Sequence, residues 1–241
     1  MFRKKKDGVE AILYSGDRAK ILSMVKEMGG MAAEAFRLAV QSLEERDDEL
    51  ASKVIADDDA IDDMEAAIDN ECLCSIALRQ PVREDLRFVF AVLKIIMDLE
   101  RIGDQGVNIA QKAMLLNRYP LLKPLVDIPK MRDIATEMVA DSLKAFEKND
   151  IQLAMEICMR DDELDELYES IFDELIEILA RNSNGDEATA QRAAGLLWIA
   201  RHLARIGDHA TNVAERVYFM VEGERLKPII EARKKALHED K

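Results

Sequence analysis

The chain of 241 residues is 49% hydrophobic and 34% charged, and it contains only 10 Gly and 5 Pro. This balance favours long helices over a β-sheet protein. The formal charge of −14 argues against a nucleic-acid-binding protein, which would present a basic surface, and it suits ligands or partners that carry positive charge.

The first segment, residues 1–17, is a basic extension that opens with MFRKKK. No apolar run follows this start, so it does not match a secretory signal peptide. The chain also lacks any stretch of about 18 uninterrupted apolar residues. Its three cysteines are odd in number and fall within helical patterns. We therefore expect a protein of the reducing cytoplasm that does not cross a membrane.

Six segments with the hydrophobic periodicity of a helix follow, separated by clusters of turn-forming residues. These segments are residues 17–45, 47–78, 84–116, 130–148, 150–181 and 187–220. We expect an all-α fold of two tandem three-helix bundles, residues 18–120 and 127–224. Residues 225–241 are expected to form a charged C-terminal tail.

An internal duplication relates the two bundles. LERIGD at 99–104 returns as LARIGD at 203–208, 104 positions later. In the preceding helix of each bundle, the pattern D-x-x-x-D at 58–62 returns at 161–165, 103 positions later. A repeat of this length indicates that each half is one copy of the same three-helix unit.

Acidic residues on the second and third helices of each bundle are predicted to meet. Residues four apart on a helix share a face, and a short turn makes the neighbouring helices antiparallel. In such a hairpin the acids face one another at three successive levels. The predicted pairs are Asp58 with Asn108, Asp62 with Asp104 and Glu65 with Glu100, then Asp161 with Asn212, Asp165 with Asp208 and Glu169 with Ala204.

Converging carboxylates repel one another, and the sequence offers two ways to offset the repulsion. A hard cation such as Mg²⁺, Mn²⁺ or iron accepts several carboxylate oxygens directly. Alternatively, arginines on the third helices form ordinary salt bridges with the acids: Arg101, Arg201, Arg205 and Arg216. The recurrence of the acids in both bundles favours metal. Because Ala204 replaces the glutamate found at Glu100, we expect weaker metal binding in the second bundle.

Two stretches resemble the signature regions of the PhoU family: RQPVREDLRFVFAVLKIIMDLERIGDQGVNIA at 79–110 and RHLARIGDHATNVAE at 201–215. The resemblance covers residues 18–222 and implies two three-helix bundles with pseudo-twofold symmetry. It also implies multinuclear metal clusters, with iron as the expected metal and Mn, Mg or Zn as alternatives. The ligands carried over to this chain are Asp58, Asp62, Glu100, Asp104, Asp161, Asp165 and Asp208.

The resemblance further implies a regulatory role. Proteins of this family restrain phosphate uptake and repress phosphate-starvation signalling. They link the ATPase subunit of a phosphate ABC transporter to a membrane sensor histidine kinase, and they reach the inner face of the membrane only through partners. They are often homodimers, so a homodimer is expected here.

Three functions are compatible with these residues. A carboxylate-bridged di-iron enzyme would use Glu-x-x-His on two helices, and no histidine here follows an acid by three positions. A helical scaffold without metal would use the acids only as a negative face for a basic partner. The chain shows no nucleophile–base arrangement, so we predict a metal-binding adaptor that is not an enzyme. The histidines His202, His209 and His238 are expected to be solvated.

Overall fold

The computed structural model describes residues 7–181 and 186–239, with side chains from residue 16 to residue 236 outside that gap. The described residues form helices and no strand. The helices are α1 (Asp7–Glu45), α2 (Asp48–Ala56), α3 (Asp59–Arg79), α4 (Glu84–Leu116), α5 (Asp127–Lys148), α6 (Ile151–Arg181), α7 (Glu187–Glu222) and α8 (Lys227–Glu239). The prediction of an all-α duplicated fold is confirmed.

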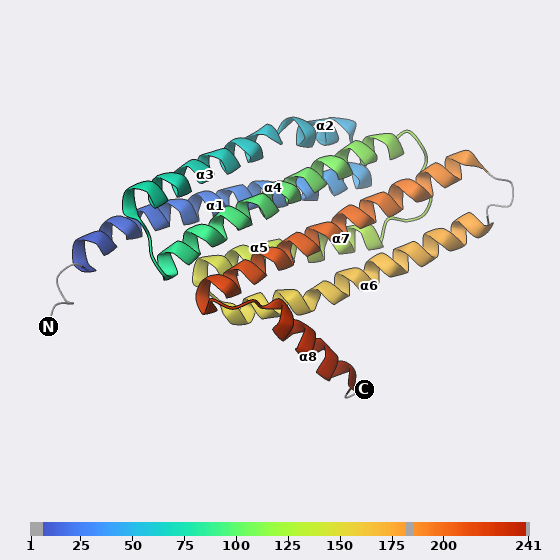
Figure 1. Cartoon of the computed structure of the whole chain (residues 1–241). Helices are drawn as coiled ribbons and strands as arrows, with labels where there is room; N and C mark the ends of the chain where they lie inside the picture. Colours follow the sequence, from blue (N-terminus) through green and yellow to red (C-terminus); the bar gives the residue numbers. More distant parts are fainter. Residues whose placement is uncertain (1–6, 182–185, 240–241) are drawn as a thin grey trace.

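The helices pack in two layers (Figure 1). Helices α3, α4, α7 and α6 lie side by side in one layer, and α1 and α5 lie behind α4 and α7. The first repeat is α1 to α4, and the second is α5 to α7 with α8 appended. None of the helices in the described part of the chain is long and apolar enough to span a membrane.

The same turn joins the first two helices of each repeat. Arg46 and Asn149 occupy equivalent positions and both adopt left-handed backbone conformations, with φ of 58° and 53°. The next residue in each repeat is an aspartate that caps the following helix: Asp47 Oδ1 accepts from Glu49 N, and Asp150 Oδ1 accepts from Leu153 N. This shared turn shows that the duplication extends to the backbone.

The second predicted helix is divided in the first repeat. Residues 47–78 were expected to form one helix, but the structure separates α2 from α3 at Asp57 and Asp58. Here the hydrogen bonds tighten to the i+3 pattern, from Ala60 N to Asp57 O and from Ile61 N to Asp58 O. Three consecutive aspartates explain this break, because aspartate is a poor helix former and the like charges repel.

Both ends of the chain contain more helix than the sequence suggested. Helix α1 begins at Asp7, inside the predicted N-terminal extension, and α8 occupies most of the predicted C-terminal tail. Helix α8 packs on α6, and Leu226 and Ile230 are buried beneath it. The burial of these apolar residues holds the last helix against the second repeat.

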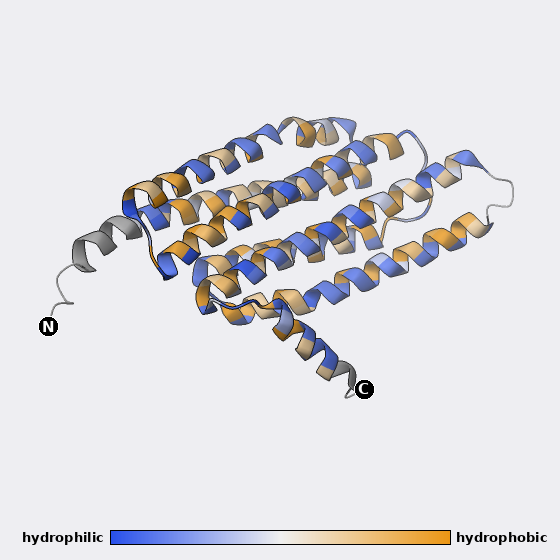
Figure 2. Ribbon diagram, in the orientation of Figure 1, coloured by the Kyte–Doolittle hydropathy of each residue, from blue (hydrophilic) through white to orange (hydrophobic). Residues whose placement is uncertain are grey.

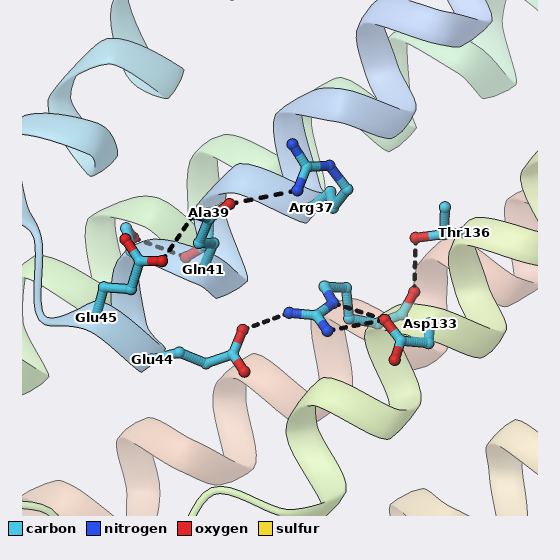
Figure 3. Close-up of polar contacts among 9 residues, drawn as sticks. Arg37, Ala39, Gln41, Glu44, Glu45, Asp133 and Thr136 are labelled. Carbon is cyan, nitrogen blue, oxygen red and sulfur yellow. Dashed lines mark hydrogen bonds and ion pairs between the residues drawn. The ribbon is translucent and has the colours of Figure 1, made fainter.

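Hydrophobic and hydrophilic residues alternate along the helices (Figure 2), and the buried apolar side chains form one continuous core across the two repeats. Phe88 of the first repeat stacks on Phe146 of the second, with ring centroids 5.9 Å apart. Behind them α1 and α5 are joined by two ion pairs, Glu44 with Arg132 (Figure 3) and Glu147 with Lys26, in which the two glutamates occupy equivalent positions of the repeats. The repeats therefore pack as one folded unit.

Helices α4 and α7 meet through buried polar residues. His209 Nδ1 donates to Asp98 Oδ1 at 3.0 Å, and His202 Nδ1 donates to Gln105 Oε1 at 2.7 Å. In the duplication, Asp98 corresponds to His202 and Gln105 corresponds to His209, so each pair is the counterpart of the other. A pseudo-twofold axis therefore passes between α4 and α7, which run antiparallel. Both histidines are buried, so the prediction that they are solvated is wrong. The side chain of His238 lies outside the described residues.

Candidate metal centres

The first acidic cluster lies where α3 runs beside α4. Asp58 directs its carboxylate toward Gly103, since a Cβ at Gly103 would lie 3.4 Å from Asp58 Oδ1. Burial raises the pKa of Asp58, and the neighbouring Asp62 and Asp104 raise it further. These three carboxylates therefore share one site, and Gly103 leaves room for Asp58 to approach α4.

The two glutamates predicted for this cluster also lie in it. Burial raises the pKa of Glu100, and Asp104, Glu65 and Asp62 add to the increase, while Arg101 opposes it. The pKa of Glu65 is raised by burial and then by Asp69 and Asp62. Thus each of the five acids predicted for the first repeat lies near at least one other of them.

The second acidic cluster repeats this arrangement between α6 and α7. A Cβ at Gly207 would lie 3.2 Å from Asp161 Oδ1. Burial raises the pKa of Asp161 to about 6, with further contributions from Asp165 and Asp208. The pKa of Asp208 is raised by burial and by Asp165. The three aspartates therefore lie near enough to one another for Asp165 to raise the pKa of both Asp161 and Asp208.

The remaining positions of the second cluster differ from the first. Ala204 is buried on α7 where Glu100 stands on α4, and Glu169 is exposed on α6. Glu169 is not among the acids that perturb Asp161 or Asp208. Asn212 donates from Nδ2 to Asp98 Oδ1 at 3.0 Å. Its side chain therefore binds the first repeat, and Asp161 instead approaches Gly207 on α7, which differs from the predicted pairing of Asp161 with Asn212.

Ordinary salt bridges do not neutralise these acids. Among the described side chains, none of the nine predicted acids lies within 4.0 Å of a basic nitrogen. Arg201 and Arg205 lower the pKa of Asp208 only through space. The alternative, in which arginines form direct salt bridges with the clustered acids, is thus not found among the described residues.

The donor set fits a hard cation, although the side chains do not enclose one as they stand. In the described part of the chain, no group of three or more His, Cys, Asp or Glu side chains is placed to hold a metal ion. Oxygens from two helices nevertheless converge with uncompensated charge, and several of the carboxylates are exposed, namely Asp62, Asp104, Asp165 and Asp208. Exposed side chains change rotamer on a fast timescale. The clusters therefore need only side-chain movement to close around a cation.

Sequence reasoning missed one charge beside the second cluster. Lys234 on α8 forms an ion pair with Asp162 at 2.6 Å, and it lowers the pKa of Asp161 against the effect of burial. The apolar spacing of Leu226, Ile229 and Ile230 is the signal that could have predicted this helix. The position of Lys234 could not have been found from that spacing alone.

Comparison with known proteins gives a consistent result. The family model described as the PhoU domain matches residues 25–113 and 128–217. A phosphate-specific transport system accessory protein PhoU homolog of Clostridium acetobutylicum is 35% identical over 215 residues, which is 89% of this chain and 96% of that protein. The homolog of the same name from Aquifex aeolicus is 42% identical over 203 residues, 84% of this chain and 90% of that one.

Two solved structures share the fold. The crystal structure of PhoU from Pseudomonas aeruginosa has a TM-score of 0.82 and 32% identity, covering 88% of this chain and 100% of that one. The phosphate transport system regulatory protein PhoU from Streptococcus pneumoniae has a TM-score of 0.79 and 27% identity, covering 88% and 98%. The similarity thus spans both repeats of the chain.

Proposed function

This chain belongs to the PhoU family, and on that premise we propose that it is a metal-binding adaptor that restrains phosphate uptake and phosphate-starvation signalling. Its relatives are named accessory proteins of the phosphate-specific transport system. That role is regulatory, and the chain is not an enzyme. In our proposal the adaptor couples the ATPase subunit of a phosphate ABC transporter to a sensor histidine kinase.

The proposed adaptor works in the cytoplasm as a homodimer and reaches the membrane only through these two partners. An adaptor needs a stable body with separate surfaces. The continuous core across the repeats supplies such a body, and the outward faces of its two layers remain available for partners.

The metal part of the proposal depends on one observation. In each repeat, carboxylates from two adjacent helices converge beside a glycine without an ion pair to Lys or Arg among the described residues. A bound cation would remove the repulsion and connect α3 to α4 and α6 to α7. Iron is the proposed metal, with Mn, Mg or Zn as alternatives, because an all-oxygen donor set accepts each of them according to availability.

A scaffold that works without metal is the second candidate. It is favoured by the finding that no three potential ligands close on one point in the described part of the chain. In this version the acids present a negative face to a basic partner. Elemental analysis of protein purified without chelator separates the two candidates. The adaptor proposal requires a bound metal that is lost in the double variant Asp104→Ala, Asp208→Ala.

The regulatory role is tested in the native host. Deleting the gene should activate a phosphate-starvation reporter in high phosphate and increase phosphate uptake, and the wild-type gene should reverse both effects. The Asp104→Ala, Asp208→Ala variant should restore repression only partly. The matched control removes two exposed acids outside the clusters, Asp63→Ala and Asp173→Ala, and should restore repression fully. A silent reporter and unchanged uptake after deletion would contradict the regulatory role.

A further inference from the structure

Helices α4 and α7 lie side by side (Figure 1), and basic and aromatic residues follow the line between them. Helical periodicity places six residues in one strip on the outer edge of this pair. We call them the α4–α7 strip: Lys94, Arg101 and Lys112 on α4, and Trp198, Arg205 and Arg216 on α7. The duplication relates Lys94 to Trp198, Arg101 to Arg205 and Lys112 to Arg216.

The cations of this strip are not neutralised by close ion pairs, although Arg101 and Arg205 act at longer range on Glu100 and Asp208. Within the described side chains, none of its Lys or Arg residues forms an ion pair, although the chain carries a formal charge of −14. Arg216 Nε is buried without a hydrogen-bond partner. Their positive field extends into the interface, because His202 beneath them has its pKa lowered to about 4, by burial and then by Arg205, Lys112 and Arg201.

An apolar pocket opens at one end of the strip. It has a volume of about 350 Å³ and is lined by Lys112, Leu115, Leu116, Arg118, Tyr119 and Trp198 among others. Trp198 is 56% exposed and Leu115 is 47% exposed. The residues lining this pocket include two cations and no acid. A pocket of this kind fits a large apolar side chain flanked by carboxylates.

The other end of the strip is wider and less suited to an apolar anchor. A hollow of about 650 Å³ there includes Phe90, Phe219 and Arg216, but also the acids Glu215 and Glu231. The two ends of the strip therefore differ, and the end at Trp198 is the one suited to bind an apolar side chain.

The width of the strip limits what can bind it. The first acidic cluster lies on the α3 side of α4, and the second lies on the α6 side of α7. A flat anionic membrane or a nucleic-acid duplex would contact these acids as well as the strip and be repelled. A single helix, about 10–12 Å across with its side chains, fits between them.

We propose that the α4–α7 strip docks an acidic amphipathic helix of a partner protein, with one large apolar side chain of that helix in the Trp198 pocket. Grooves between helices commonly receive partner helices in this way. The inference deepens the proposed adaptor role and rests on it for its biological meaning. Its test uses purified full-length protein in chelator, so it fails separately from the metal and signalling proposals.

The probe is a synthetic helical peptide of about 18 residues, or about 27 Å, with leucines on one face, glutamates on the other and no aromatic residue. Binding is measured by anisotropy of the labelled peptide. We expect saturable binding with a Kd below about 100 μM. The emission of Trp198, the single tryptophan in the chain, should shift to the blue as the peptide covers it.

The double variant Lys112→Glu, Arg118→Glu should weaken binding about tenfold or more. The control variant, Lys130→Glu with Lys144→Glu, makes the same charge change at two exposed α5 residues and should leave the affinity unchanged. Should the charge reversals at the pocket disturb folding by circular dichroism, the pair Arg101→Gln, Arg205→Gln provides a second, milder test with the same direction of change.

Four results would overturn the proposal. These are no saturable binding up to about 1 mM, equal weakening in the control variant, equal binding of a scrambled peptide without an apolar face, and binding of anionic vesicles through the strip in preference to the peptide. Loss of self-association in the Lys112→Glu, Arg118→Glu variant, with no peptide binding by the wild type, would instead assign the strip to a second copy of this chain.

Discussion

The two acidic clusters occupy equivalent places in the two repeats, yet they are neutralised differently. In the first, five acids interact beside Gly103, and no cation lies within 4.0 Å of them among the described residues. In the second, Ala204 removes one acid, Asp161 is more strongly perturbed, and Lys234 of α8 lies close by. The second repeat therefore adds Lys234 as a counter-charge from α8, whereas in the first only Arg101, on α4 itself, opposes the raised pKa of Glu100.

The backbone of the second helix also differs between the two repeats. In the first repeat, Asp57 begins the run of three aspartates that divides α2 from α3, whereas α6 runs unbroken through the equivalent Arg160. Arg160 Nη1 forms an ion pair with Asp141 Oδ2 at 3.2 Å. In this chain the helix continues where the basic Arg160 precedes the acids, and it breaks where three aspartates follow one another. An external cation should therefore matter most in the first repeat.

The largest expected effect concerns the packing of the first repeat. A Cβ at Gly106 would lie 2.9 Å from Phe36 N and 3.1 Å from Ala35 C, which are backbone atoms of α1. The second repeat has Ala210 at the equivalent position. Gly106→Ala should reduce the free energy of unfolding by about 2–4 kcal/mol, measured by urea unfolding. The reciprocal Ala210→Gly should cost only about 1 kcal/mol, and equal effects would contradict the comparison.

The missing glutamate can be restored with Ala204→Glu. Because Ala204 is buried beside the second cluster, an added carboxylate should lower the free energy of unfolding in chelator by about 2–3 kcal/mol. Added Mn²⁺ or Fe²⁺ should recover part of this loss and increase the metal content. Ala190→Glu, at an exposed position of the same helix, is the matched control. If Ala204→Glu left the free energy of unfolding in chelator unchanged, position 204 would not lie close to the acids of the second cluster.

The perturbed Asp161 should make stability depend on pH. Its folded-state pKa of about 6 lies above the ordinary 3.8, so folding favours the protonated form. This stabilising contribution is complete below about pH 3.8 and is lost as the pH rises through about 6. Asp161→Asn should therefore stabilise metal-free protein at pH 7.5 by about 1–2 kcal/mol and have little effect at pH 4.

Chemical unfolding at the two pH values measures this difference. Asp58→Asn should show a smaller effect of the same sign, because the pKa of Asp58 is raised by the same causes but less strongly. Asp173→Asn on exposed α6 surface is the control and should show none. A loss of stability at pH 7.5 in Asp161→Asn would contradict the repulsion inferred for the second cluster.

The smallest expected effect belongs to Lys234. In its ion pair with Asp162 the Asp162 side chain is 51% exposed and that of Lys234 27%, so Lys234→Ala should lower the free energy of unfolding by about 1 kcal/mol or less. It should also shift the pH dependence due to Asp161 upward, because Lys234 opposes the rise in that pKa. In an Asp161→Asn background the shift should disappear. Its persistence there would show that Lys234 acts through another group.

Local sequence pattern was enough to predict the helical class and the duplication, and it singled out the acids of both halves. Hydrophobic periodicity fixes which face of each helix is buried, and repeat spacing places the acids of both halves on equivalent faces. The same spacing predicts Asp62 beside Asp104 and Asp165 beside Asp208, and Asp165 does raise the pKa of Asp208. The sequence motifs also indicated the family, which the comparisons confirm. These features follow from local pattern, so they can be read without coordinates.

Which side chains meet across the repeats depends on how the helices pack in three dimensions. The spacing of one helix does not specify the rotation and axial shift of another, because these depend on side-chain packing over the whole interface. This is why Asn212 binds Asp98 and not the second cluster, why His202 and His209 are buried, and why Lys234 lies beside Asp161. The α4–α7 strip arises in the same way, since its cations come together only when the two repeats pack.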